Sequence, residues 1–231
     1  MKTQDHINKS FDEELERLYD EIKRMGDLAI AQLNAAVDVL NRRDSNAAAR
    51  VVANDEAIDA IENEVSMDVL KLLALRQPMA RDLREVYATL RISADIERIG
   101  DYASNVAKRS MVLNNNPPLE ATARIARLAK TANQLLSDAL QAYADSDAEL
   151  ASKVRDADAE LDAQYTSYFR ELVTYMIEDP RTIGSCTHLM FMAKNIERIG
   201  DHATNIAENT WFVVHGDMPE GARKKGDKTS E

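Results

Sequence analysis

The sequence has few of the residues that make turns, cross-links or membrane spans. Its 231 residues include 7 glycines, 5 prolines and a single cysteine, Cys186. One cysteine cannot form an internal disulfide, which fits a reducing compartment such as the cytoplasm. No run of about 18 apolar residues is present, and the polar N-terminus predicts no signal peptide. Any contact with a membrane is therefore expected through a partner protein.

Positive charge and aromatic residues are scarce as well. Lys and Arg number 29 against 40 Asp and Glu, which gives a formal net charge of −11, and aromatics make up 5% of the chain. This balance disfavours a nucleic-acid partner, because phosphates require Lys and Arg concentrated on one face. It suits cations or basic protein surfaces. The abundant residues are helix formers, and we expect an all-α protein with long helices.

Apolar residues recur at gaps of three and four and predict six amphipathic helices, ending near residues 40, 76, 113, 144, 179 and 215. The segment 114–118, with three Asn and two Pro, is the strongest break and divides the chain into halves. We therefore expect two tandem three-helix up-down-up bundles, over residues 1–116 and 117–216. The remaining stretch, 217–231, lacks periodicity and is predicted to be disordered.

A twelve-residue segment occurs twice, one hundred residues apart. Residues 96–107 and 196–207 are identical at nine positions, and the largest change is Tyr102 to His202. Each copy places Glu, Asp and Asn four residues apart, on one face of a helix. The preceding helix of each half carries a second acidic pair, at an offset of 103. These features indicate duplication of the whole three-helix unit.

The acidic residues form two candidate sites. On a helical wheel the Glu/Asp/Asn face of residues 97–105 lies roughly opposite the apolar stripe, so we expect it at the bundle surface. Antiparallel packing of the second and third helices would bring four carboxylates together in each half. The predicted sets are Asp55, Asp59, Glu97 and Asp101 in the first half, and Asp158, Asp162, Glu197 and Asp201 in the second.

Most carboxylates spaced four apart belong simply to a solvated helix face. Here, however, like charges that repel by a few tenths of a kcal/mol recur in four corresponding places. A bound cation would relieve this repulsion, and oxygen ligands suit Mg, Ca, Mn or iron. Asn105 and Asn205 can add a ligand oxygen, or else cap or bond a facing helix. Arg98 and Arg198 can pair with the acids when metal is absent.

Glycine occurs at the same position of both copies, Gly100 and Gly200. Inside a helix each costs about 1 kcal/mol relative to Ala. We interpret the pair as points where a neighbouring group approaches the backbone closely, and tight helix packing is the simplest form of that approach.

At these residues the chain resembles the PhoU family, bacterial accessory proteins of phosphate transport and signalling. The resemblance covers two three-helix repeats, the paired E-R-I-G-D…N segments and the E/D-x-x-x-D pairs. It implies multinuclear metal clusters, iron or zinc among them, at Asp55/Asp59, Glu97/Asp101, Asp158/Asp162 and Glu197/Asp201. It further implies a non-enzymatic negative regulator of the phosphate regulon that links the Pst transporter's ATPase subunit to the sensor kinase PhoR, often as a homodimer. The copies differ at Lys108 and Glu208, so the two clusters can differ in metal preference or occupancy.

Two alternative functions belong to other classes. A di-iron carboxylate oxidase needs Glu-x-x-His pairs on inward faces, and residues 3, 185, 199 and 212, three before each histidine, are not Glu. A purely structural helical adaptor without metal is compatible with composition alone. No P-loop, Ser-His-Asp series or Cys-x-x-Cys is present, so direct nucleotide or phosphate binding has no support in the sequence.

Overall fold

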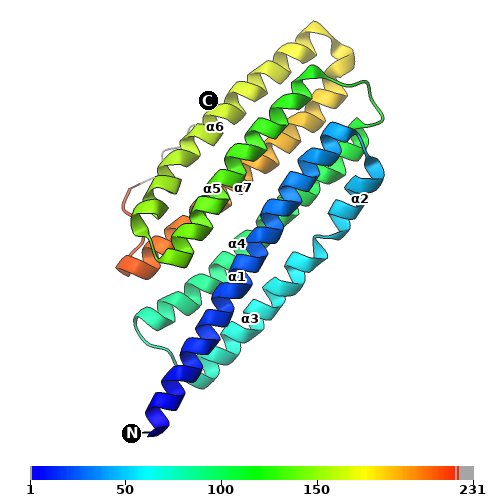
Figure 1. The fold of residues 1–231 in the computed structure, drawn as a ribbon. Helices are drawn as coiled ribbons and strands as arrows, with labels where there is room; N and C mark the ends of the chain where they lie inside the picture. Colours follow the sequence, from blue (N-terminus) through cyan, green and yellow to red (C-terminus); the bar gives the residue numbers. More distant parts are fainter. Residues whose placement is uncertain (1, 222, 224–231) are drawn as a thin grey trace.

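The computed structural model describes residues 2–221 and 223, and within these residues it contains helices and no strand (Figure 1). The all-α prediction is confirmed. The elements are α1 (Lys2–Arg42), α2 (Ser45–Ala53), α3 (Glu56–Arg76), α4 (Arg81–Leu113), the 3₁₀ helix η1 (Glu120–Thr122), α5 (Ala123–Asp145), α6 (Ala148–Glu178), the 3₁₀ helix η2 (Pro180–Thr182) and α7 (Ile183–His215).

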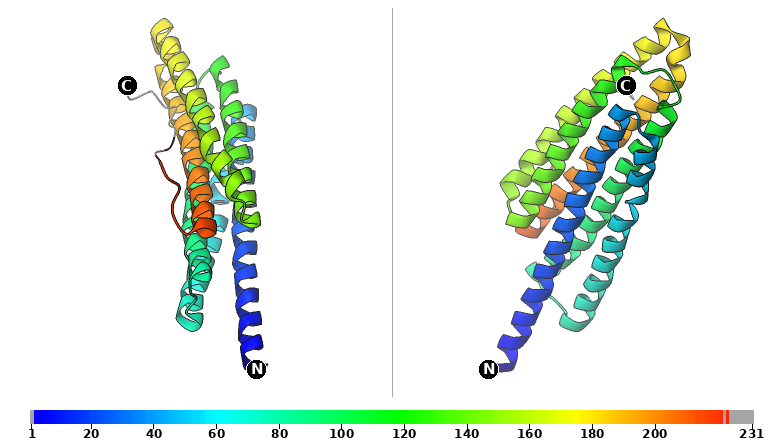
Figure 2. Two further views of the ribbon diagram at one scale, coloured as in Figure 1. Left: turned by 90° about the vertical axis from the view of Figure 1, so that its left-hand side faces the viewer. Right: turned by 45° about the vertical axis from the view of Figure 1, so that its right-hand side comes forward.

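The helices form two tandem bundles that lie side by side. α1, α2–α3 and α4 make the first repeat, and α5, α6 and α7 make the second, as the duplicated sequence predicted. The repeats meet mainly through α4 and α7, with a second contact between α1 and α5 (Figures 1 and 2). Within the described part of the chain, no helix is both long and apolar enough to cross a bilayer.

One predicted helix is broken in the structure. The sequence predicted a single second helix ending near Arg76, but α2 and α3 are separated at Asn54 and Asp55. Both residues keep right-handed helical dihedrals. The backbone hydrogen bonds here join residues three apart instead of four: Asp55 N–H donates to Val52 O (3.4 Å) and Ala57 N–H donates to Asn54 O (3.1 Å). Asn and Asp are weak helix formers. The matching helix of the second repeat, α6, continues through this position.

Buried apolar stripes hold each bundle together. On α1, Leu18, Ile22 and Met25 of the stripe with gaps of three and four residues are at most 1% exposed. Burying one such side chain contributes about 1.5–3 kcal/mol relative to leaving it in water. Aspartate side chains cap the N-termini of α2 and α6: Asp44 accepts from Ala47 N–H at 2.9 Å, and Asp147 accepts from Leu150 N–H at 3.0 Å. Caps of this kind contribute about 1 kcal/mol each.

The motif-bearing helices α4 and α7 pack antiparallel. Arg84 Nε donates to Val213 O at 3.4 Å near one end, and Arg109 Nη1 lies 3.4 Å from His188 Nδ1 near the other. Residues in contact therefore have numbers that sum to about 297. Small buried residues, among them Ala103 and Ala203, line the motif segments. Both motifs lie near the middle of their helices, so the two carboxylate faces are found about midway along the molecule.

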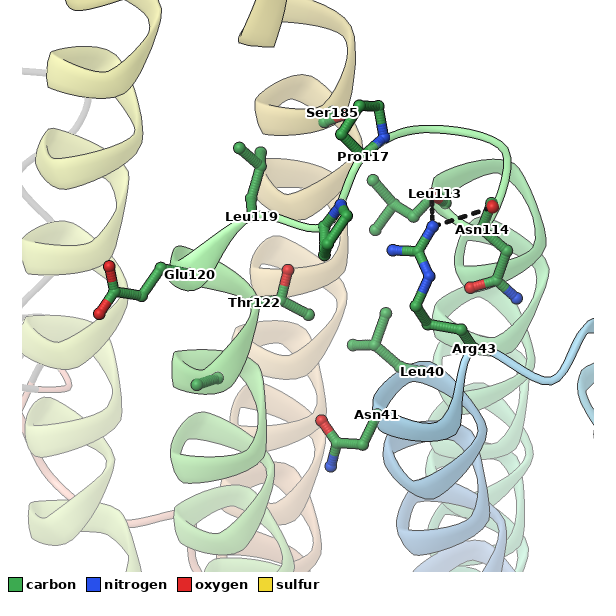
Figure 3. A pocket seen from close by; sticks show the side chains of 12 residues that line it. Leu40, Asn41, Arg43, Leu113, Asn114, Pro117, Leu119, Glu120, Thr122 and Ser185 are labelled. Carbon is green, nitrogen blue, oxygen red and sulfur yellow. Dashed lines mark hydrogen bonds between the residues drawn. The ribbon is translucent and has the colours of Figure 1, made fainter.

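The linker between the repeats is fastened by one arginine. Arg43 follows α1 with a positive φ of 56°. Its Nη2 donates to the carbonyl oxygens of Leu113 (3.3 Å) and Asn114 (2.9 Å) at the C-terminus of α4 (Figure 3), and also to that of Asn116 (2.5 Å) in the linker. The guanidinium thus meets the negative end of the α4 dipole and satisfies carbonyls that the helix leaves open. The pocket drawn in Figure 3 lies between this arginine and the start of the second repeat.

The chain after α7 turns back on itself. Gly216 ends α7 with a φ of 87°, a left-handed conformation that favours glycine. Residues 217–221 form no regular element, yet they and Arg223 make specific contacts with α6 and α7. The rest of the segment predicted to be disordered, residue 222 and residues 224–231, lies outside the described residues.

Two candidate carboxylate sites

The first carboxylate site, defined by Asp55, Asp59, Glu97 and Asp101, lies between the start of α3 and the middle of α4. The break before α3 places Asp55 as the N-terminal flanking residue and Asp59 in the first turn. The second pair follows from helical spacing on α4. This site faces outward as predicted, with the side chain of Asp101 41% exposed and that of Glu97 27% exposed.

Basic and amide groups hold the first site. Gln32 Nε2 on α1 donates to Asp55 Oδ1 at 2.9 Å. Arg98 reaches both acids of α4, with Nη1 3.1 Å from Asp101 Oδ2 and Nε 3.4 Å from Glu97 Oε2. The predicted pairing of this arginine with the acids is confirmed. Exposed pairs of this kind contribute at most about 1 kcal/mol.

The acids of α3 and α4 repel one another across the helix pair. Burial raises the pKa of Asp59, and the charges of Asp55 and Asp101 raise it further. Burial also raises the pKa of Glu97, with the nearby Asp101 adding to the shift and Arg98 opposing it. These shifts arise because carboxylates from two helices lie close enough to repel one another and are partly shielded from water.

The second carboxylate site, defined by Asp158, Asp162, Glu197 and Asp201, lies between α6 and α7. Here the prediction of an outward acidic face is wrong. Asp158, Asp162 and Glu197 are only 5%, 4% and 4% exposed. A wheel drawn on one helix does not include the groups that other segments bring to that face, here Arg223 from the chain after α7.

The buried acids of the second site are incompletely satisfied. Lys194 Nζ lies 2.8 Å from Glu197 Oε1. Within the part of the chain that the structure describes, Asp158 Oδ1 and Glu197 Oε2 are buried without a hydrogen-bond partner. A buried acceptor left unpaired costs about 1–3 kcal/mol, and more when it is charged. The second site therefore has two buried carboxylate oxygens that could still accept a ligand.

Protonation is the alternative way to relieve such a site. Burial raises the pKa of Asp158 to about 7, with the charges of Asp162 and Asp201 adding to the shift and Arg223 opposing it. Burial likewise raises the pKa of Glu197 against the opposing effect of Lys194. Near neutral pH Asp158 is thus poised between its charged and neutral forms.

The glycines of the motifs make room for these carboxylates. A Cβ at Gly100 would lie 2.9 Å from Ile58 Cδ1 and 3.1 Å from Asp55 Oδ1. At Gly200 it would lie 2.5 Å from Leu161 Cδ2 and 2.8 Å from Asp158 Oδ1. The predicted close approach is therefore confirmed, and the approaching groups are a core aliphatic side chain and a site carboxylate.

One substitution between the repeats explains why the second site is less satisfied. The third atom near a Cβ added at Gly100 would be Gln32 Oε1, at 3.7 Å. For a Cβ added at Gly200 it would be Leu135 Cδ1, at 3.6 Å. The two residues correspond at the same offset of 103 that relates the acidic pairs. The amide that donates to Asp55 is thus replaced by an alkyl group beside Asp158, which leaves Asp158 Oδ1 without that donor.

The two motif asparagines were predicted either as ligands or as bonds to a facing helix. Asn205 has the second role: its Nδ2 donates to Asp95 Oδ1 on α4 at 2.9 Å, and its Oδ1 accepts from Arg223. Asn105 is half-buried on α4. Asp95 also lies 2.7 Å from His202 Nδ1, so the Tyr102/His202 difference falls at the contact between repeats. Arg198 lies over the Tyr102 ring at 5.7 Å instead of pairing with the acids.

The donor chemistry of both sites fits a hard cation, and the second site has buried oxygens available for one. Metal-ready geometry is not preformed: among the described residues, no three His, Cys, Asp or Glu side chains are grouped so that they could already hold an ion. Lys194, Arg98 and Arg223 lie where a cation would compete for the same oxygens. Cation binding would require these side chains to move aside.

Three histidines contact groups other than the eight site acids. His188 is beside Arg109, His202 pairs with Asp95, and His215 stacks on Trp211 at 4.2 Å. A di-iron oxidase needs histidine and carboxylate ligands on the same inward faces. The geometry therefore gives that alternative no support.

Fold and sites together define a tandem-repeat helical-bundle protein with one carboxylate site in each repeat. The chain matches the family model of the PhoU domain over residues 22–110 and again over 125–210. It belongs to the PhoU family.

Relatives agree over nearly the whole length. A "Phosphate-specific transport system accessory protein PhoU homolog" from Xylella fastidiosa (strain 9a5c) is 60% identical over 225 residues, 97% of this chain and 95% of the relative. A protein of the same description from Caulobacter vibrioides (strain NA1000 / CB15N) is 46% identical over 98% of this chain and 99% of its own. The crystal structure of PhoU from Pseudomonas aeruginosa aligns with a TM-score of 0.86 at 37% identity, covering 90% of this chain and 100% of that one.

Proposed function

We propose that this protein is a non-enzymatic accessory protein of phosphate transport that acts as a negative regulator of the phosphate regulon. In this role it is cytoplasmic, works as a homodimer, and links the ATPase subunit of the Pst transporter to a PhoR-type sensor kinase. The observation that carries the proposal is the match of both repeats to the PhoU domain, together with relatives of up to 60% identity described as accessory proteins of phosphate-specific transport.

A surface suited to protein contact supports the regulatory role. The α3–α4 hairpin exposes large apolar side chains: Leu75 is 76% exposed and Met79 is 79% exposed, and Leu70, Leu83 and Tyr87 are also exposed. Clustered apolar side chains of this kind commonly mark binding surfaces. The net charge of −11 adds a preference for partners with basic surfaces.

The proposal includes cation binding at both carboxylate sites. Asp55, Asp59, Glu97 and Asp101 would hold ions in the first repeat, and Asp158, Asp162, Glu197 and Asp201 in the second. Oxygen ligands suit iron, Mn, Mg or Ca, and several carboxylates from two helices can bridge more than one ion. A bound cation would supply the positive charge that Arg98 and Lys194 now provide, and so change the charge of the surface that partners meet.

The regulatory role is tested in the cell with a phosphate-responsive reporter. Deleting the gene should raise reporter expression in phosphate-rich medium, and the wild-type chain should restore repression. Replacing the hairpin pair Leu75 and Met79 with Asp should weaken repression and reduce recovery of the ATPase subunit or the kinase in a pull-down. Unchanged expression after deletion would remove the regulatory proposal.

Cation binding is tested by elemental analysis of the purified protein. Asp101→Ala and Asp201→Ala should each lower bound metal, and the double variant should lose most of it. Asp38→Ala is the matched control, because it removes one carboxylate from an exposed pair with Arg42 (3.0 Å) outside both sites. Equal metal in the wild type and the double variant would refute this part of the proposal.

A further inference from the structure

The residues after α7 form an extended strap along the second repeat. We call residues 217–221 together with Arg223 the C-terminal strap. Gly216 reverses the chain direction, and the strap then runs back beside α6 and α7 (Figure 2, left view). It passes over Ala151, Arg155, Glu208 and Trp211, which line the groove beneath it.

Two arginines attach the strap to the helices. Arg155 on α6 donates to the carbonyl oxygens of Glu220 (3.4 Å) and Gly221. Arg223 of the strap binds Glu208 on α7 through two bonds of 2.9 and 2.7 Å, and it also donates to the side-chain oxygen of Asn205. In this bidentate geometry two guanidinium nitrogens donate to the two oxygens of one carboxylate, which makes such arginine–carboxylate pairs strong.

Arg223 also supplies charge to the second carboxylate site. Its Nη1 lies 4.0 Å from Asp201 Oδ1, and its side chain is 23% exposed. Its positive charge acts on Asp158 as well, where it opposes the effect of burial on the pKa. The strap thus places one cationic group at the edge of a site whose buried Asp158 and Glu197 oxygens lack hydrogen-bond partners within the described chain.

The strap is long enough for this contact. Fourteen residues of α7 separate Asp201 from His215, which at about 1.5 Å per residue is about 21 Å. Seven residues lead from Gly216 to Arg223, and at about 3.6 Å per residue they span at most about 25 Å. The extended Arg223 side chain adds further reach towards Asp201.

Apolar packing holds the strap weakly. Met218 is 52% exposed, and a cavity of about 480 Å³ remains between the strap and the two helices. Its attachment therefore depends mainly on the polar contacts of Arg155 and Arg223. Among the acceptors that Arg223 contacts, Asp201 is the one that a cation in the second site would also bind, so a bound cation would weaken that contact and repel the guanidinium.

The first repeat has no equivalent of this attachment. At the positions that correspond to Arg155 and Glu208 it carries Val52 and Lys108, an apolar and a basic residue. The chain after α4 continues into η1 and α5. The first site depends instead on Arg98, a residue of its own helix whose side chain is 58% exposed.

We propose that the C-terminal strap is a tethered cationic ligand of the second carboxylate site, so that Arg223 and a metal ion compete for that site, whereas the first site meets only the exposed Arg98 of its own helix. The inference rests on the proposed cation binding at the carboxylate sites. It predicts that the two sites load at different cation concentrations, and that loading of the second site releases the strap and uncovers the groove at Trp211.

Calorimetric titration with Mn²⁺ tests the competition. The first site is disabled with Asp59→Asn and Asp101→Asn, so that binding reports the second site. Adding Arg223→Ala should then tighten Mn²⁺ binding about tenfold, equivalent to about 1.4 kcal/mol. Arg198→Ala, which removes the same charge from α7 at a residue over Tyr102, should change affinity less than twofold.

Trypsin gives a second readout that does not depend on affinity. The protease must take the Arg223 side chain into its own specificity pocket, so cleavage after Arg223 should be slow in the free wild-type protein and faster at saturating Mn²⁺. Mass spectrometry separates this product from cleavage after Lys224. Unchanged Mn²⁺ affinity in Arg223→Ala, or a cleavage rate indifferent to Mn²⁺, would overturn the strap inference alone. Failure of both sites to bind Mn²⁺ in every variant would refute the proposed cation binding and the inference with it.

Discussion

Gly200→Ala should destabilise the protein although alanine is the better helix former. The exchange gains about 1 kcal/mol of helix preference. The added Cβ, however, would lie 2.5 Å from Leu161 Cδ2 and 2.8 Å from Asp158 Oδ1. Leu161 is fully buried and cannot move aside without disturbing the core. Overpacking of a core typically costs about 1–3 kcal/mol, so we expect a net loss of up to about 2 kcal/mol.

The chain provides two controls for this exchange. Gly184 lies in the same helix, and a Cβ added there would meet no atom within 4 Å, so Gly184→Ala should stabilise the protein by up to about 1 kcal/mol. Gly100→Ala should fall between the two, because its nearest contact is 2.9 Å and its carboxylate contact is 3.1 Å. The expected order of stability is Gly184→Ala, then wild type, then Gly100→Ala, then Gly200→Ala.

Urea denaturation followed by far-UV circular dichroism and by Trp211 fluorescence measures these differences. Trp211 is the only tryptophan and lies on α7, so it reports the second repeat directly. Combining Gly200→Ala with Leu161→Ala should give less than the sum of the two losses, because the contact is removed. Equal stabilisation by Gly200→Ala and Gly184→Ala, or strict additivity in the double variant, would refute the close-approach argument.

Two further predictions concern the second site and the linker. The pKa of Asp158 is raised from about 3.8 to about 7, so between these values the folded protein binds more protons than the unfolded chain; stability should fall as pH rises through this window. Asp158→Asn should reduce that fall, measured as the urea midpoint at pH 5 and pH 8, and an undiminished fall would contradict the assignment. Arg43→Ala leaves the carbonyls at the end of α4 without their donor and should cost about 1–2 kcal/mol in urea unfolding, whereas no loss would show that water replaces the guanidinium.

Local patterns were enough to predict the helices and the duplication. Three- and four-residue gaps on α1 identify its buried stripe, and the paired segments around Gly100 and Gly200 identify the repeat. The break at Asn54 and Asp55 was missed because the apolar period continues across it. Its local signal, two adjacent weak helix formers, is present in the sequence.

The composition of the candidate sites was predictable, but their surroundings were not. Helical spacing identified the eight carboxylates, and the acids of each half exert charge on one another as expected. The burial of Asp158 and Glu197 depends on residues from elsewhere in the chain. Arg223 reaches the second site from the far end of α7, and Leu135 faces it from α5, so no window around the motif contains either. The contact of Lys194 with Glu197 could have been predicted, since the two residues are three apart on one helix face.

The antiparallel pairing of α4 and α7 relates the repeats as two halves of an isologous dimer. Asp95 on one copy meets His202 on the other, and the reciprocal positions are Asn195 and Tyr102. A true homodimer of one repeat would be obliged by its symmetry to carry two identical sites. Fusion into one chain removes that obligation, so that each copy can diverge on its own. If the proposed cation binding holds, one polypeptide would then bind cations at two different concentrations.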